Sequence, residues 1–269
     1  MYILIIIVCI IAVILAISIQ INPDLDPISG EETQNNTTII EKTQEDLKRA
    51  FNQLFNNTID FNNYDTSAVP KIDANKEIVY TAYNIDKTED DKYEVDINLP
   101  IININNQVGQ GFNDITQKIF ANKATEILQN AKMYTIYSVK YTGYINGDIL
   151  SVIIKSTLKE GTSAQRIIVQ TYNYNLATGE EVNVYEAIAQ TGTTELDVKN
   201  KIKTEITKAI KEANKIQISG YETYTRDINS EIYKLENIST FFIGPDQKLH
   251  IIFAYGNDHF TSEMDIIEI

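Results

Sequence analysis

The sequence predicts an α+β fold: a largely antiparallel sheet with two main helices packed on it, preceded by one N-terminal transmembrane helix and a linker. Three observations lead to this prediction. A charge-free apolar run opens the chain, segments rich in β-branched and tyrosine residues recur after residue 76, and two segments among them have the apolar spacing of helices. The expected order after residue 76 is β-β-α-β-β-β-α-β-β-β.

Residues 1–21 are expected to form a transmembrane anchor. No charged residue occurs from Ile3 to Ile21, and at about 1.5 Å per residue a helix of this length spans roughly 30 Å of hydrocarbon. A cleaved secretory signal has a basic start and a shorter apolar core. Here the best cleavage candidate, Ala16-Ile17-Ser18, lies inside the apolar run. We therefore expect the anchor to be retained, with cleavage as the alternative.

The flanking charges predict a single-pass protein of a bacterial cell membrane with its C-terminal domain outside. The first basic residue is Lys42, and a long domain behind a short N-terminal stub usually translocates. The abundance of Ile, Asn and Lys is typical of AT-rich bacterial coding sequences. Cys9 is the only cysteine, so no internal disulfide can form.

Residues 22–75 are expected to form a linker that contains an amphipathic helix near 40–57. The stretch 22–38 combines Pro, Gly, Asn and acidic residues with few apolar ones. Within the helix, one face carries the apolar side chains of Leu47, Phe51, Leu54 and Phe55. This apolar stripe would pack either on the domain or on a partner.

The domain 76–269 begins with two strands around the acidic loop KTEDDK, and a helix of several turns follows Pro100. Asn146-Gly147 predicts the next hairpin, because both residue types tolerate positive φ. A third strand near 166–176 leads to a helix that starts at Thr193 or Thr194. A hairpin around Pro245-Asp246 and a closing strand end the chain. Two lobes, 76–175 and 176–269, are an alternative to a single unit.

The charge balance excludes some partners. The formal net charge is −14, and the first charged residue is Asp24, so the acidity belongs to the part outside the membrane. Nucleic acid is not an expected partner, because phosphate binding needs a basic surface. A cationic partner would be attracted. The alternative interpretation is that the acidity only keeps an exposed domain soluble.

The residues that usually carry catalysis are scarce, and we expect a protein that is not an enzyme and has no cofactor and no metal. The chain has two histidines, His250 and His259, too few for a His-based zinc site. Cys9 lies in the apolar run, and Gly109 and Gly111 do not complete a phosphate-binding motif.

The sixteen tyrosines and no tryptophan suggest either packing in a sheet or a recognition surface, and packing is the favoured interpretation. The tyrosines in or beside predicted strands are Tyr141, Tyr144, Tyr172, Tyr174, Tyr221, Tyr224 and Tyr255. The candidates for ligand contact are Tyr255 and, in the loop-like sequence GNDHF, His259.

Several strand motifs resemble one bacterial extracytoplasmic domain family. The motifs are Ile149-Leu150-Ser151-Val152, then Asn175-Leu176-Ala177-Thr178-Gly179 with Val182 and Tyr185, the entry INLPIININNQ, and a closing hairpin at 241–253. The pattern is similar to the domain, of unknown function, shared by the lysozyme-sensing anti-sigma factor RsiV and the non-catalytic module of the peptidoglycan deacetylase PdaC. The resemblance covers about residues 76–269 and implies an RsiV-like α+β domain.

The chain departs from that family pattern at two places. Ser163-Ala164-Gln165 stands where the family often has Gly-Ala-His, and residues 255–259 replace an Ala-Pro-Gly stretch. Only Met1 and Tyr2 precede the apolar run, and the sequence stops at Ile269. We therefore expect neither the sigma-binding segment of the anti-sigma factor nor the catalytic domain of the deacetylase.

Three functions remain open from the sequence. The first is a membrane-anchored, non-catalytic binding module whose ligand is a cationic protein such as lysozyme or a cell-wall polymer. The second is a regulatory sensor that docks a partner membrane protein through the apolar stripe. The third is a cell-wall hydrolase, which the sparse catalytic residues disfavour. Ligand identity, signalling and oligomeric state are not determined by the sequence.

Overall fold

A computed structural model describes residues 42–216, 224–255 and 263–269. Residues Lys42–Ile269 form one compact unit. The domain therefore begins well before residue 76, and residues 42–75, which we expected in a linker, are part of it. The predicted anchor 1–21 lies outside the described residues.

No helix among the described residues is both long enough and apolar enough to span a membrane.

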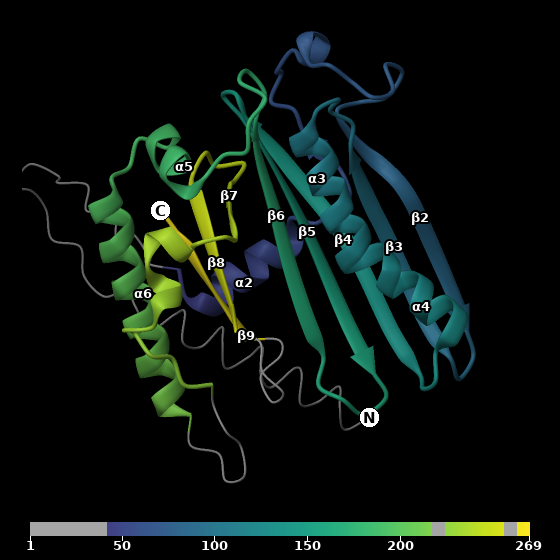
Figure 1. Ribbon diagram of the computed structural model, residues 1–269. Coiled ribbons are helices and arrows are strands. Elements are labelled where there is room, and N and C mark those ends of the chain that lie inside the picture. The colour runs from purple at the N-terminus through teal and green to yellow at the C-terminus, as the bar shows by residue number, and fades with distance from the viewer. Residues whose placement is uncertain (1–41, 217–223, 256–262) are drawn as a thin grey trace, which may run out of the picture. The chain divides into compact units, whose positions relative to one another are not determined.

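The first sheet has six strands, and its five long strands lie in the order β2-β3-β4-β5-β6 (Figure 1). Their bounds are β2 Val79–Glu89, β3 Tyr93–Ile102, β4 Thr135–Asn146, β5 Ile149–Glu160 and β6 Arg166–Asn175. Among these five strands, all neighbours are antiparallel except β3 and β4. A parallel pair needs a long crossover. It is supplied by α3 (Gln107–Thr116), a π-helical turn (Gln117–Ala121) and α4 (Asn122–Asn130).

The part of the chain expected to be loop-like, residues 57–75, contributes a sixth strand. β1 (Ile59–Asp60) pairs in parallel with β4 beyond the point where β3 leaves it. A 3-10 helix, Thr66–Ala68, follows. Val69 is 7% exposed in the core of this sheet. Such short pairings carry no periodic pattern in the sequence, which is why the prediction missed them.

The hairpin between β4 and β5 forms, but its turn is one residue later than expected. Asn146 pairs with Ile149 in the strand register, so Gly147 and Asp148 are the turn residues. Gly147 has φ +56°, and Gly at the first position is typical of one class of two-residue hairpin turn. Asn146 is thereby left in the strand, where its side chain is buried.

The C-terminal strands form a second sheet instead of extending the first. Its order is β7 (Phe241–Ile243), β8 (Leu249–Tyr255) and β9 (Glu263–Glu268), all antiparallel. Side chains of the first sheet bind the backbone of the edge strand β7. Asn173 Nδ2 donates to Phe241 O at 2.9 Å, and Ile243 N donates to Ser151 Oγ at 3.2 Å. Because side chains satisfy these backbone groups, β7 does not join the ladder of β6.

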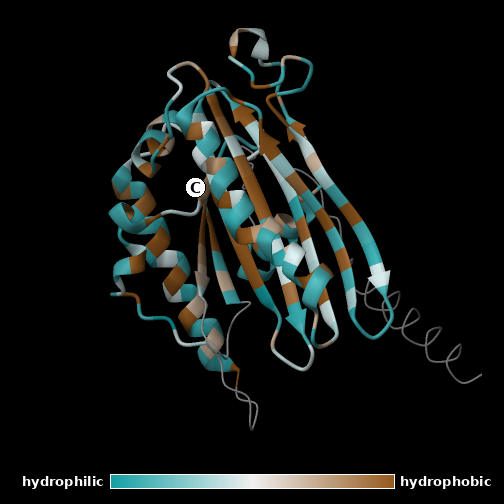
Figure 2. Ribbon diagram, turned by 45° about the vertical axis from the view of Figure 1, so that its right-hand side comes forward, coloured by the Kyte–Doolittle hydropathy of each residue, from teal (hydrophilic) through white to brown (hydrophobic). Residues whose placement is uncertain are grey.

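Three hydrophobic clusters hold the layers together. One lies between the first sheet and α3–α4, and one lies between the second sheet and the helices α5 (Val184–Gln190) and α6 (Glu195–Lys215). The third lies between the two sheets. Figure 2 shows hydrophobic residues running along the central strands and hydrophilic residues on much of the helix surface. Two 3-10 helices, Glu231–Tyr233 and Leu235–Asn237, precede β7.

The amphipathic helix exists as α2, Gln44–Gln53, shorter than expected. Thr43 and Asp46 form a capping box at its start. Leu47 and Phe51 are 7% and 3% exposed and belong to the cluster between the sheets, where the ring of Phe51 lies 6.2 Å from that of Phe242. The domain itself therefore covers the apolar stripe, which cannot serve as a free docking surface in this conformation.

Candidate functional site

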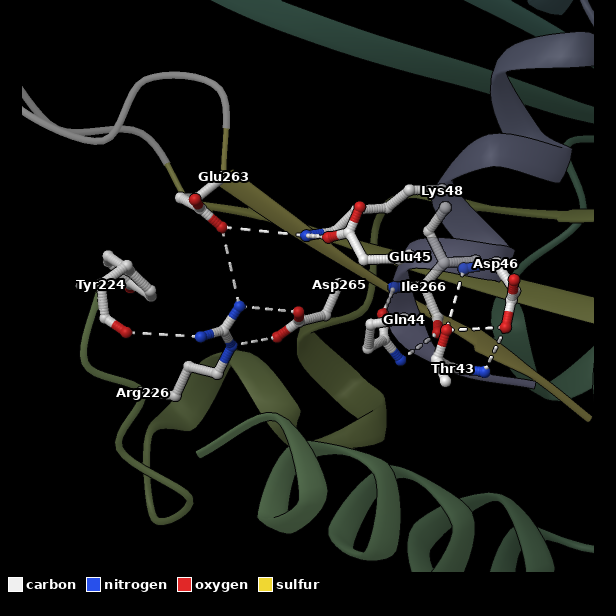
Figure 3. A network of polar contacts seen from close by, with 10 residues as sticks. All are labelled: Thr43, Gln44, Glu45, Asp46, Lys48, Tyr224, Arg226, Glu263, Asp265 and Ile266. Atoms are coloured by element: carbon white, nitrogen blue, oxygen red, sulfur yellow. Dashed lines mark hydrogen bonds and ion pairs between the residues drawn. The ribbon is translucent and has the colours of Figure 1, made fainter. Parts of the chain in front are cut away.

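A buried ion pair joins β9 to the segment that begins at residue 224 (Figure 3). The alternation of β9 places Met264 and Ile266 between the sheets and directs Asp265 toward the opposite face. The side chain of Asp265 is fully buried, and that of Arg226 is 6% exposed. Arg226 Nη2 donates to Asp265 Oδ1 at 2.8 Å, and Arg226 Nε donates to Oδ2. This is the two-pronged geometry that guanidinium and carboxylate groups favour.

Three tyrosines complete this ion-pair network. Tyr255 Oη donates to Asp265 Oδ2 at 2.8 Å, and the hydroxyl groups of Tyr233 and Tyr255 are 2.8 Å apart. Tyr224 stacks on Tyr255 with ring centroids 4.5 Å apart. The Arg226 guanidinium lies 5.4 Å from the centroid of Tyr255. The aspartate charge is thus surrounded by donors, as a buried carboxylate requires.

The electrostatics of this network favour a fixed arrangement. Burial, and then the charge of Asp265, raise the pKa of Tyr255, so its hydroxyl keeps the proton that it donates. Burial lowers the pKa of Arg226, but the hydrogen bond and charge of Asp265 raise it more, and the net shift is upward. The described contacts therefore link β9 firmly to the segment that begins at residue 224. Tyr255 and Arg226 keep the protons that they donate to Asp265.

The two predicted contact residues have different outcomes. Tyr255 is 4% exposed and its hydroxyl is engaged within the network, so it packs in the protein interior. His259 lies outside the described residues. The packing interpretation of the strand tyrosines is confirmed for Tyr141, Tyr144, Tyr172, Tyr174 and Tyr255, all of them buried.

A second group of polar side chains could in principle hold a cation. One ligand atom each from Asp246, His250 and Glu268 lies within 4.8 Å of the others. Glu268, however, is already bound by Lys42 at 2.7 Å and by Lys248 at 2.6 Å. His250 Nε2 lies 3.1 Å from Asp246 Oδ1. The two lysine ammonium groups on the Glu268 carboxylate compete with any cation. The cluster is therefore a group of ion pairs that connects the segment just before α2 to the second sheet.

The β2–β3 hairpin carries a dense acidic surface. Residues 86–96 contain six carboxylates and two lysines. Asp86 and Asp96 face each other across the two strands, an arrangement that is locally unfavourable for like charges. Lys140 compensates Asp96 at 2.6 Å, whereas Asp86, Asp90 and Asp91 are exposed. We call Asp86, Asp90, Asp91, Glu94 and Asp96, together with Tyr134 and Ile136, the hairpin surface.

Apolar side chains lie within this acidic group. Tyr134 and Ile136 are each 38% exposed. Ile136 pairs with Glu94 across β3 and β4, and Tyr134 Oη donates to Glu94. The hydrogen bond to Glu94 raises the pKa of Tyr134, and the charges of Glu94, Asp90 and Asp91 add to the shift. In the strand register Ile136 lies between Glu94 of β3 and the exposed Lys159 of β5, so this surface combines exposed apolar side chains with an excess of carboxylates.

The sequence does not indicate that the residues of the ion-pair network, or those of the hairpin surface, come together. The signal for the network was a charged residue, Asp265, inside the apolar strand sequence EMDIIEI. Its partner Arg226 lies 39 residues away and has no pattern of its own. The acidic loop was visible, but the contribution of Tyr134 and Ile136 depends on the parallel pairing of β3 with β4.

No protein-family model and no curated protein matches the sequence. Among solved structures, a DUF3298 family protein from Pseudomonas aeruginosa PAO1 is 10% identical, with 75% of this chain and 90% of that chain covered and a TM-score of 0.41. A member of the same family from Bacteroides fragilis NCTC 9343 is also 10% identical, with coverages of 66% and 80% and a TM-score of 0.32. These values describe a distant similarity of structure.

Proposed function

We propose that this protein is a membrane-anchored, extracytoplasmic, RsiV-like binding module without catalytic output. Its ligand is a cationic protein such as lysozyme, or a cell-wall polymer. The apolar run 3–21 supplies the anchor, and the strand motifs after residue 76 supply the resemblance. The observation that carries the proposal is the hairpin surface, where exposed Tyr134 and Ile136 lie in a region in which carboxylates outnumber basic side chains.

Charge explains why a cationic protein fits this surface. A ligand with surface Lys and Arg would relieve the repulsion between Asp86 and Asp96 and would be steered toward a protein of net charge −14. The apolar side chains would supply the contacts that persist when charge attraction is weakened. A specific complex should therefore keep part of its affinity in salt.

Calorimetric titration of the full chain, in nonionic detergent, with lysozyme tests this proposal. The Debye length falls from about 10 Å at 0.1 M salt to about 3 Å at 1 M, so titrations at these two concentrations separate steering from contact. Saturable binding at both concentrations is the expected result. Heat that disappears entirely at high salt would indicate unspecific charge attraction and would contradict a built lysozyme-binding surface.

The membrane topology is tested on intact cells with a membrane-impermeant maleimide. Ser163 lies in the exposed β5–β6 turn, and Cys9 is the only native cysteine. In a Cys9→Ser background, S163C is expected to react without cell lysis. Labelling only after lysis would place the domain inside the cell and would end the proposal. The Cys9→Ser chain alone is the control.

A further inference from the structure

A small cavity lies at the turn between β4 and β5, away from the hairpin surface. Its volume is about 150 Å³, and every residue that lines it is uncharged. Four carboxamide side chains from four separate segments line it: Asn62, Asn146, Gln190 and Gln247. The protein has a net charge of −14, so a cavity that is lined by uncharged amides differs in its chemistry from an acidic surface.

Asn146 presents a fixed acceptor to this cavity. Its Nδ2 donates to Ile243 O at 3.1 Å and to Gly244 O at 3.2 Å, which fixes the orientation of the amide. Asn146 is 8% exposed, and its Oδ1 accepts no hydrogen bond from any described residue. Within the described part of the chain no fully buried side-chain oxygen lacks a partner. This Oδ1 is therefore in contact with solvent. The contact is through the cavity, because Asn146 is one of the residues that line it.

The other amides are available as well. Among the described residues, the side chains of Asn62, Gln190 and Gln247 make no hydrogen bond, and Thr191 Oγ1 uses its proton on Ala187 O or Ile188 O while its lone pairs can still accept. Gly147 allows Gln190 to approach, because a Cβ at this position would lie 2.5 Å from Gln190 Nε2.

Gln247 occupies a backbone position that normally favours glycine. Its φ is +61°, in the turn between β7 and β8, where Gln247 N donates to Gly244 O at 3.0 Å. Gly or Asn is the usual choice at positive φ, and a glutamine there costs conformational energy. Strain of this kind gathers at functional sites. A glutamine side chain at this position is explained if it contacts a ligand.

We propose that the cavity binds one sugar residue of an uncharged glycan, such as an N-acetylhexosamine. Asn146 offers an acceptor, and the carboxamides of Asn62, Gln190 and Gln247 offer donors as well, which matches the hydroxyl and acetamido groups of such a sugar. Without a charged lining residue, the cavity has no strong attraction for an ion. Its volume is below the roughly 300–1,000 Å³ of pockets for drug-sized ligands, so the cavity can take no more than a single ring. The inference rests on the proposed function, in the alternative in which the ligand is a cell-wall polymer.

Saturation-transfer NMR with the full chain tests this, in a detergent that has no sugar headgroup. The probes are N-acetylglucosamine, its trimer triacetylchitotriose, and glucuronate as the charged comparison. The informative variant is Gln247→Gly, which removes the amide and relieves the positive φ. It should weaken binding of the neutral sugars about tenfold, the equivalent of one or two hydrogen bonds, while its unfolding midpoint stays equal or rises.

The matched control is Asn63→Gly, since Asn63 has φ +59°, is exposed and does not line the cavity. Its affinity should equal that of the wild type. Tighter binding of the trimer would identify a polymer as the source, and equal binding a free sugar or chain end. No saturable binding of either neutral sugar, equal affinity of Gln247→Gly, or preference for glucuronate would overturn the inference. Sugar binding lost while lysozyme still binds would remove this cavity alone and leave the proposed function standing.

Discussion

Replacing Asp265 by Asn should destabilise the protein more than any exposed charge change. The carboxylate accepts hydrogen bonds from Arg226 and Tyr255, and the side chains of Asp265 and Arg226 are 0% and 6% exposed. Asparagine has nearly the same shape as aspartate, but it has no charge. Its NH₂ group would face a hydrogen-bond donor of Arg226 or Tyr255. Breaking one side of a buried ion pair costs about 3–5 kcal/mol because the other charge stays buried. We expect a loss in this range in the free energy of unfolding.

Urea unfolding followed by circular dichroism measures this loss, with Glu231→Gln as the matched control. Glu231 makes the same kind of ion pair with Lys234 at 2.7 Å, but the two side chains are 72% and 50% exposed. Such surface pairs contribute about 0–1 kcal/mol. If Asp265→Asn lowers the free energy of unfolding by no more than Glu231→Gln does, the network does not stabilise the fold as a buried ion pair. Replacing both Asp265 and Arg226 by apolar residues should recover part of the loss.

Three further predictions concern packing and pH. Asn173→Ala should cost at least about 2 kcal/mol in urea unfolding, because Ser151 Oγ and Phe241 O lose a buried partner; a cost under about 1 kcal/mol would show that these bonds do not join the sheets. Phe51→Ala should cost roughly 3 kcal/mol through the cavity left between the sheets, and an unchanged stability would mean that α2 packs elsewhere. Burial raises the pKa of Asp246, but the bond and charge of His250 lower it to about 2 overall. The stability advantage of wild type over Asp246→Asn should therefore be lost as the pH falls from about 4 toward 2; a difference that stays constant over this acidification would contradict this.

The order of strands and helices after residue 76 was predictable because each long element carries its own periodicity. The helix 195–215 has an N-cap at Thr194 and apolar residues on one face, and the structure shows both. The division into two sheets was not predictable. It depends on Ser151, Thr171 and Asn173, polar residues in apolar strands that bind the backbone of β7. From the sequence alone, these residues indicate only solvent-facing strand positions.

The candidate sites were less predictable than the fold, for the same physical reason. The hairpin surface needs the register of β3 against β4, and the ion-pair network needs Arg226 beside Asp265. The amide-lined cavity joins four segments whose sequences have no common motif. Contacts between segments far apart in the chain leave no local pattern. The positive φ of Gln247, which marks the cavity, is visible only in the structure.

The most direct test of the proposed function is calorimetric titration of lysozyme into three forms of the full chain. The first is wild type, the second carries Asp86→Asn and Glu94→Gln in the hairpin surface, and the third carries Glu195→Gln and Glu212→Gln on α6. Each variant loses two carboxylates, so both have the same net charge, and Glu195 and Glu212 are exposed. We predict saturable binding to wild type, at least a tenfold loss in the hairpin variant and little change in the α6 variant. Equal affinities for the two variants, or no saturable binding to wild type, would contradict a lysozyme-binding role for the hairpin surface.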